Sequence, residues 1–146
     1  MSTAATIHRE IANLWNQRDW SGLRNVLHSG YSYTSGLGKE MTGEAMLNIA
    51  KMFTNAFPDG KLEVKQVYTQ GDVAIAETVA RGTHQGELLG VAATGKPVEL
   101  LLCNVIELRD GKVYREREYM DMLTVMTEIG VVKAPALQQA GLGYGG

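Results

Sequence analysis

The sequence contains few of the residues and patterns that identify several common protein classes. Its 146 residues include one cysteine, Cys103, which excludes an internal disulfide and a multi-cysteine metal site. Cys103 stands in an apolar run without a basic neighbour, so we expect an inert core thiol. The formal net charge is −2. The chain therefore lacks the basic excess that favours nucleic acids or anionic membranes as partners.

Long hydrophobic runs are also missing. No apolar stretch approaches the roughly 18 residues of a membrane-spanning helix, and the N-terminus lacks the cationic start and apolar run of a secretory signal. These absences predict a cytoplasmic location. The chain is 45% hydrophobic and 21% charged, as in ordinary globular proteins. We expect one domain over residues 1–133 and a glycine-rich tail over residues 134–146.

Helical spacing of apolar residues dominates the first part of the chain. It predicts helices over residues 6–18, 20–27 and 43–57, with Asp19 and Thr42 as N-caps of the second and third. A further helical turn or two is possible over 122–129. The apolar face of the first helix is formed by Ile7, Ile11, Leu14 and Trp15. Its polar side is assigned to His8, Arg9, Asn13 and Gln17.

After Gly60 the period changes from 3.6 to 2, which predicts strands. Asp110-Gly111 separates the last two, and this dipeptide is typical of a two-residue hairpin turn. One face of the strand at 73–81 carries only small residues, so a helix can approach it closely. The predicted strands cover residues 31–35, 62–69, 73–81, 98–108 and 113–120. The small residues are Ala74, Ala76, Thr78 and Ala80.

This order of elements predicts an α+β fold. Three N-terminal helices would cover one face of a strongly curved antiparallel sheet, which makes a cone-shaped barrel with an internal pocket. Aromatic residues of the helices and the first strand would be core by default, although several could line a pocket for a flat, apolar ligand. They are Trp15, Tyr31, Tyr33, Phe53 and Phe57.

The last strand carries an unusual density of charge. Alternation places Tyr114, Glu116 and Glu118 on one face and Val113, Arg115, Arg117 and Tyr119 on the other. If the glutamates face the helices, a buried carboxylate would have a raised pKa and could act as a general base. The alternative is a set of cross-strand salt bridges on a solvated sheet.

Other polar residues have both a structural and a functional interpretation. Glu77 and Asn104 interrupt apolar strands and are candidates for polar groups in the pocket; a core asparagine bonded to backbone is equally consistent. His84 is either a surface-loop histidine or an acid, base or hydrogen-bond donor. The three histidines have no metal-binding spacing, and the Gly36–Lys39 segment lacks the pattern of a nucleotide-binding loop.

The order of several segments resembles a known family. These segments are ANLWNQRDWSGLRNVLH, YSYTSG, a middle helix ending AFPD, GTHQGELLGVAATGKPV and ELRDGKVYREREYMDML. Together they resemble the SnoaL-like polyketide cyclases of the nuclear transport factor 2-like, ketosteroid isomerase-like superfamily. The resemblance covers about residues 7–130. It implies a cone-shaped α+β barrel with a deep pocket, a homodimer, and a cofactor-free intramolecular aldol condensation of a polyketide ester.

The resemblance also implies site residues. Glu118 matches the family's acid/base aspartate, Asp121 its second acid, and His84 its Thr-His-x-Gly stretch, so these three are the predicted catalytic residues. Asn104 and Glu116 are predicted to bind substrate, together with Trp15, Tyr33, Phe53 and Phe57. We expect a lyase, isomerase or cyclase that acts on a small apolar carbonyl compound without metal or cofactor.

Two alternatives remain at this point. An epoxide hydrolase-like member would use Glu118, Arg117 and Asp121 to activate water. A non-catalytic member would use the pocket or the sheet face to bind a ligand or partner. The direction in which Glu116 and Glu118 point discriminates between enzyme and binding module.

Overall fold

The computed structural model describes residues 3–35 and 38–133. The predicted glycine-rich tail at 134–146 lies outside the described residues. The helices are α1 (Ala4–Gln17), α2 (Trp20–Asn25), α3 (Gly43–Ala56) and α4 (Met122–Glu128). The strands are β1 (Leu27–Ser35), β2 (Glu40–Met41), β3 (Lys61–Gln70), β4 (Val73–Thr83), β5 (Pro97–Arg109) and β6 (Lys112–Met120).

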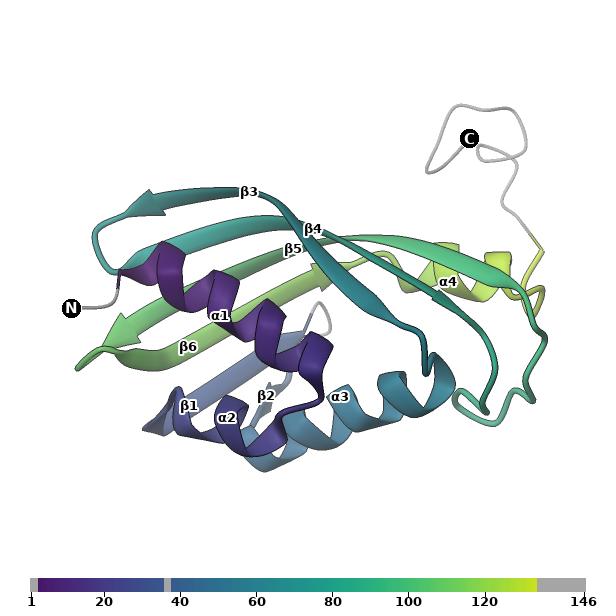
Figure 1. Cartoon of the computed structure of the whole chain (residues 1–146), viewed down its shortest axis with the longest axis horizontal. Coiled ribbons are helices and arrows are strands. Elements are labelled where there is room, and N and C mark those ends of the chain that lie inside the picture. Colours follow the sequence, from purple (N-terminus) through teal and green to yellow (C-terminus); the bar gives the residue numbers. More distant parts are fainter. Residues whose placement is uncertain (1–2, 36–37, 134–146) are drawn as a thin grey trace.

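The strands form one curved sheet in the order β2-β1-β6-β5-β4-β3, and the helices lie against it (Figure 1). The predicted α+β class is confirmed. The sheet is mixed rather than purely antiparallel, because β1 pairs with β6 in parallel while every other pair is antiparallel. Within the described residues the sheet does not close, and its edges are β2 and β3. The parallel pair joins two distant parts of the chain, so no local turn signal announces it.

Several local signals have the predicted effect. Asp19 caps α2 by accepting the Gly22 N–H at 2.8 Å, and Thr42 caps α3. Asp110 and Gly111 have φ values of 54° and 74° in the turn between β5 and β6. That turn places β6 antiparallel to β5 along most of its length.

The second helix is shorter and the first strand longer than predicted. α2 ends at Asn25, and Leu27 already belongs to β1, where it pairs with Val113 of β6. The Val113 N–H donates to the Val26 carbonyl at 2.9 Å. Pairing with a strand far along the chain therefore overrides the helical periodicity of this segment.

A β-bulge changes the alternation in β6. Glu107 pairs with Arg115 and Leu108 pairs with Val113, so Tyr114 is an extra residue on β6. The prediction that Val113 lies on the face opposite Glu116 is therefore wrong. Val113 is fully buried on the helix side of the sheet, and Glu116 is buried as well. The bulge lets both residues point to the interior.

Helix α1 lies across β3, β4 and β5. Ala74 and Ala76 of β4 are fully buried, as expected for the small face that admits a helix. Apolar side chains gather in two separate clusters. One joins the end of α3 to β5 and α4, and includes Phe57, Leu100 and Val125. The other joins the start of α1 to β4, β5 and β6, and includes Ala4, Ile7, Ala74, Ile106 and Val113.

Candidate active site

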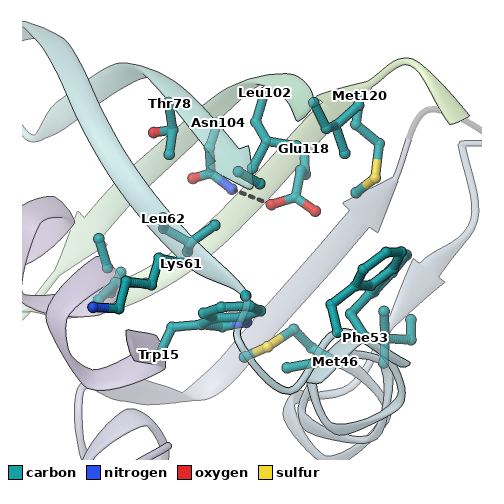
Figure 2. A pocket seen from close by; sticks show the side chains of 18 of the residues that line it. Trp15, Met46, Phe53, Lys61, Leu62, Thr78, Leu102, Asn104, Glu118 and Met120 are labelled. Carbon is teal, nitrogen blue, oxygen red and sulfur yellow. Dashed lines mark hydrogen bonds between the residues drawn. The ribbon is translucent and has the colours of Figure 1, made fainter. Parts of the chain in front are cut away.

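A cavity of about 160 Å³ lies between helices and sheet. Trp15, Tyr33, Phe53 and Phe57, four residues predicted to contact an apolar ligand, all line it. Figure 2 shows Trp15, Met46 and Phe53 facing Asn104 and Glu118 across the space. Most other lining side chains are aliphatic, among them Ile11, Leu62, Leu100, Leu102 and Met120. The volume is close to the ~150 Å³ of an engineered cavity that binds benzene, so the space is large enough for an aromatic ring.

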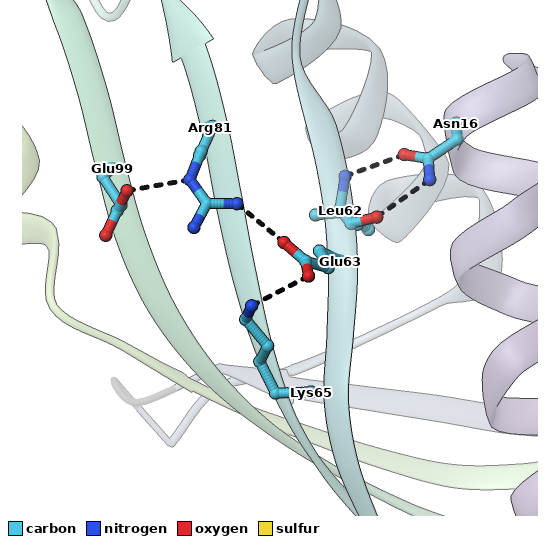
Figure 3. Close-up of polar contacts among 6 residues, drawn as sticks. All are labelled: Asn16, Leu62, Glu63, Lys65, Arg81 and Glu99. Atoms are coloured by element: carbon cyan, nitrogen blue, oxygen red, sulfur yellow. Dashed lines mark hydrogen bonds and ion pairs between the residues drawn. The ribbon is translucent and has the colours of Figure 1, made fainter.

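One side of the cavity is held by polar contacts at the start of β3 (Figure 3). Asn16 of α1 donates to the Leu62 carbonyl at 2.9 Å and accepts the Leu62 N–H at 2.8 Å. Arg81 bridges Glu63 and Glu99 at 2.8 Å each. Leu62 and Arg81 both line the cavity. The Asn16 contacts join α1 to β3, and the Arg81 ion pairs link β4 to β3 and β5 at this side.

The polar end of the cavity holds two carboxylates joined by one amide. Asn104 Nδ2 donates to Glu116 Oε2 at 2.8 Å and to Glu118 Oε2 at 3.2 Å. In the sheet, Asn104 of β5 pairs directly with Glu118 of β6. All three residues line the cavity. Both glutamates therefore face the interior, where the amide uses its two hydrogens to hold them side by side.

Two tyrosines of β1 complete this cluster. Tyr33 donates its hydroxyl hydrogen to Glu118 Oε1 at 3.0 Å, and Tyr31 donates to Glu116 Oε1. Burial raises the pKa of both phenols above their usual range, and the nearby carboxylates add a smaller rise. Both tyrosines therefore keep their protons and remain donors. The parallel pairing of β1 with β6 brings these residues together.

Glu118 has a strongly perturbed pKa. Burial raises the pKa of its carboxyl to about 7, and the neighbouring charge of Glu116 acts in the same direction. The hydrogen bonds from Tyr33 and Asn104 lower the pKa and offset part of this effect. A carboxyl with this pKa exchanges a proton near neutral pH, as a general acid or base requires.

The salt bridges expected on a solvated sheet involve other residues. Arg117 points outward and pairs with Glu107 at 2.6 Å, and Arg115 lies 3.7 Å from Glu40 Oε1. Glu77 is exposed on β4, so the interpretation of Glu77 as a pocket residue is wrong. Alternation along the strands separates these outward charges from Glu116 and Glu118.

His8 of α1 is a cavity residue that the periodicity analysis placed on the polar side of the helix. It is 5% exposed, lines the cavity, and its Nε2 lies 3.2 Å from the Asn104 carbonyl oxygen. Its spacing from Ile11 and Trp15 is that of one helix face, which was the available signal. Tyr31 was recognised only as an aromatic residue; its contact with Glu116 depends on the parallel strand pair.

Two predicted catalytic residues do not line the cavity. His84 is fully buried, and its Nδ1 lies 2.9 Å from Thr94 Oγ1 and accepts the Thr94 N–H at 3.3 Å. Asp121 is the N-cap of α4, where its carboxylate accepts the Thr124 N–H at 3.1 Å and the Thr124 hydroxyl at 2.7 Å. Asp121 follows the end of β6, so the strand alternation that points Glu118 inward no longer applies to it.

Residues 3–35 and 38–133 contain no cluster of three or more potential metal-ligating side chains. None of the helices in these ranges is long and apolar enough to span a membrane.

Comparison with known proteins gives a family and a set of relatives. A family model for SnoaL-like polyketide cyclases matches residues 5–129. Aklanonic acid methyl ester cyclase AcmA of Streptomyces galilaeus is 23% identical over 136 residues, which cover 89% of this chain and 92% of that protein.

Solved structures agree with the fold. AclR of Streptomyces galilaeus, a proposed hydroxylase, has a TM-score of 0.85 and 26% identity, covering 94% of this chain and 88% of its own. IdmH of Streptomyces antibioticus, a proposed polyketide cyclase, has a TM-score of 0.80 and 25% identity. The match covers 89% of this chain and 100% of IdmH. An epoxide hydrolase from M. tuberculosis is 13% identical and has a TM-score of 0.66. The match covers 86% of this chain and 88% of the hydrolase, and at this identity it shows a shared fold alone.

Proposed function

The chain belongs to the SnoaL-like polyketide cyclase family, and on that premise we propose that it closes a ring in an apolar polyketide ester by intramolecular aldol condensation. Glu118 is the general acid and base in this proposal. Asn104 and the two tyrosines position the carboxylates, and the aromatic residues of the cavity bind the carbon skeleton. The reaction needs no external cofactor, because the carboxylate supplies the proton transfer.

One observation carries the proposal. Glu118 lines an apolar cavity, and its carboxyl has a pKa of about 7. A carboxylate of ordinary pKa is a weak base toward a C–H bond next to a carbonyl, whereas a desolvated one is stronger. Glu118 also has fixed hydrogen-bond donors at both oxygens, which hold its orientation.

The proton balance closes on one residue. Ionised Glu118 takes a proton from the carbon next to one substrate carbonyl. The resulting carbanion attacks a second carbonyl of the same molecule, which forms the carbon–carbon bond and leaves an alkoxide. Protonated Glu118 returns the proton to that alkoxide. Asn104 acts here as a positioning residue, because both hydrogens of its amide already bond carboxylates.

The test measures turnover of aklanonic acid methyl ester, the compound that appears in the name of the S. galilaeus relative. Chiral chromatography separates and quantifies the products. Glu118→Gln should lower kcat by about 100-fold or more, the usual contribution of a general base. Glu77→Gln is the matched control, since Glu77 is an exposed glutamate on the outer face of the same sheet. Equal kcat in both folded variants would remove Glu118 from the mechanism and favour a ligand-binding module.

The hydrolase alternative has less support. It required Glu118, Arg117 and Asp121 to act together, but Arg117 bonds Glu107 on the outer face and Asp121 caps α4. A water-activating role for Glu118 alone would yield a diol from an epoxide substrate, and mass spectrometry of the product distinguishes the two reactions.

We also propose a homodimer, in keeping with the family resemblance. Large apolar side chains are exposed on the outer face of the sheet, with Leu101 70% and Tyr119 51% exposed. Sedimentation velocity measures the assembly. Leu101→Lys should shift a wild-type dimer toward monomer, whereas a wild-type monomer at micromolar concentration would refute the proposal.

A further inference from the structure

The polar end of the cavity contains acceptor atoms without donors. Among the described residues, no partner lies within hydrogen-bond distance of His8 Nδ1 or Asn104 Oδ1, and both atoms are buried. Figure 2 shows that Asn104 turns its nitrogen toward Glu118 and its oxygen away. His8 is 5% exposed and Asn104 is 6% exposed. Both residues line the cavity, and buried polar atoms are normally paired, so a group that enters the cavity can supply the missing partner.

The contact of His8 with the backbone shows which ring nitrogen carries a hydrogen. Its Nε2 lies 3.2 Å from the backbone oxygen of Asn104. A carbonyl oxygen only accepts, so Nε2 carries the hydrogen. In the neutral ring, Nδ1 then has a free lone pair and can only accept. Ala76 of β4 pairs with Asn104 in the sheet and is fully buried.

We propose that His8 Nδ1 accepts a hydrogen bond from a hydroxyl group of the ligand. The substrate is accordingly an apolar ring compound that presents an enol or phenol hydroxyl beside the carboxylate pair. This inference rests on the proposed function for the identity of the substrate as a polyketide, but the contact itself requires no turnover. His8 is then a specificity-determining residue, because a ligand without the hydroxyl leaves Nδ1 buried and unpaired.

The experiment uses two small probes that fit a ring-sized cavity, 2-naphthol and 2-fluoronaphthalene. They have nearly the same shape, and only the naphthol donates a hydrogen bond. Wild-type protein should bind 2-naphthol about fivefold more tightly, as expected for one neutral hydrogen bond of about 1 kcal/mol. Binding is measured by ligand fluorescence.

The variant His8→Gln separates the two nitrogens of the ring. A glutamine amide can replace the Nε2 donor to Asn104 but leaves no acceptor at the position of Nδ1. In this variant the two probes should bind with about equal affinity. In Glu118→Gln the fivefold preference for 2-naphthol should persist. A preference that survives in His8→Gln and disappears in Glu118→Gln would assign the hydroxyl to the carboxylate and overturn the proposal.

A measurement on the wild-type protein covers the case in which His8→Gln does not fold. Nitrogen-15 spectra of the histidine rings should show His8 as the Nε2–H tautomer. Its Nδ1 signal should move upfield with 2-naphthol and stay in place with 2-fluoronaphthalene. An Nδ1–H tautomer, or an unchanged signal with saturating 2-naphthol, would overturn the proposal. If these shifts are present but no tested substrate is turned over, the His8 contact stands and only the proposed aldol function is refuted.

Discussion

Two substitutions next to Glu118 should move its pKa in opposite directions. The Tyr33 hydroxyl stabilises the ionised form of Glu118, and the charge of Glu116 destabilises it. Tyr33→Phe should therefore raise the pKa of Glu118 from about 7, and Glu116→Gln should lower it. Both changes nearly preserve the size of the side chain, so packing should change little.

The magnitudes follow from the contacts. A hydrogen bond to a charged group contributes about 1.5 kcal/mol, which corresponds to a rise of about one in pKa when the Tyr33 hydroxyl is removed. Oxygens of Glu116 and Glu118 accept from the same Asn104 nitrogen at 2.8 and 3.2 Å, so they are at most 6.0 Å apart. At an effective dielectric constant of ~20, charges at that distance repel by about 3 kcal/mol. Removing the Glu116 charge should lower the pKa of Glu118 by about two.

The assay is a carbon-13 titration of the glutamate side-chain carboxyls. Glu118→Gln identifies the resonance of Glu118 by its absence. Tyr31→Phe is the matched control, because Tyr31 donates to Glu116 and has no hydrogen bond to Glu118. The pH dependence of kcat/KM should show its base-catalysis limb displaced in the same two directions. A pKa that stays at about 7 in Glu116→Gln, or that falls in Tyr33→Phe, would refute the assignment of these contacts.

Substitutions at three positions test stability and the limits of the site. The pKa of Glu118 is about 7 in the folded protein, above the ordinary 4.5. Protonated Glu118 therefore stabilises the wild-type fold fully below pH 4.5, and this stabilisation is lost as the pH rises through 7. Glu118→Gln cannot ionise, so it should become more stable relative to wild type as the pH rises. The difference in unfolding free energy should grow by up to about 3 kcal/mol, measured by urea denaturation at pH 4.5 and 8. Asp121→Ala should lower the unfolding free energy by about 1 kcal/mol through loss of the α4 cap, and Asp121→Asn should lower it less. Both variants should keep the wild-type kcat. A large loss of kcat in Asp121→Asn would return this residue to the mechanism. In Gly86→Ala the new Cβ would lie 2.3 Å from the Asn55 carbonyl oxygen. Thermal and urea denaturation should therefore report a loss of about 1–3 kcal/mol in unfolding free energy. An unchanged midpoint would contradict the close approach of these backbones.

Local patterns predicted most of the elements because their causes are local. The Thr42 cap and the Asp110-Gly111 turn depend on neighbouring backbone groups, so a short stretch of sequence contains the information. Alternation along one strand predicted that Glu116 and Glu118 share a face, and the structure shows that this face is the inner one. That alternation holds only between irregularities, and the bulge at Tyr114 reversed the prediction for Val113.

The residues that the sequence analysis missed depend on distant contacts. His8 contacts the Asn104 backbone because α1 packs across the sheet, and Tyr31 meets Glu116 because β1 pairs in parallel with β6. Asp121 matched a family position, yet it follows the strand and caps a helix. Sequence spacing alone does not report such contacts, since they form between segments far apart in the chain.

The sequence by itself determined the α+β class and that Glu116 and Glu118 share one face of their strand, because helix and strand periodicity decide which side chains share a face. Tertiary packing decided that this face is the inner one and that the aromatic residues line a cavity. Only the tertiary structure decided that Asn104 bridges both carboxylates, that tyrosines from a distant strand donate to them, and that Glu118 titrates near pH 7. The physical reason is that a pKa depends on burial and on neighbouring charges. Both exist only after the sheet and the helices have packed together.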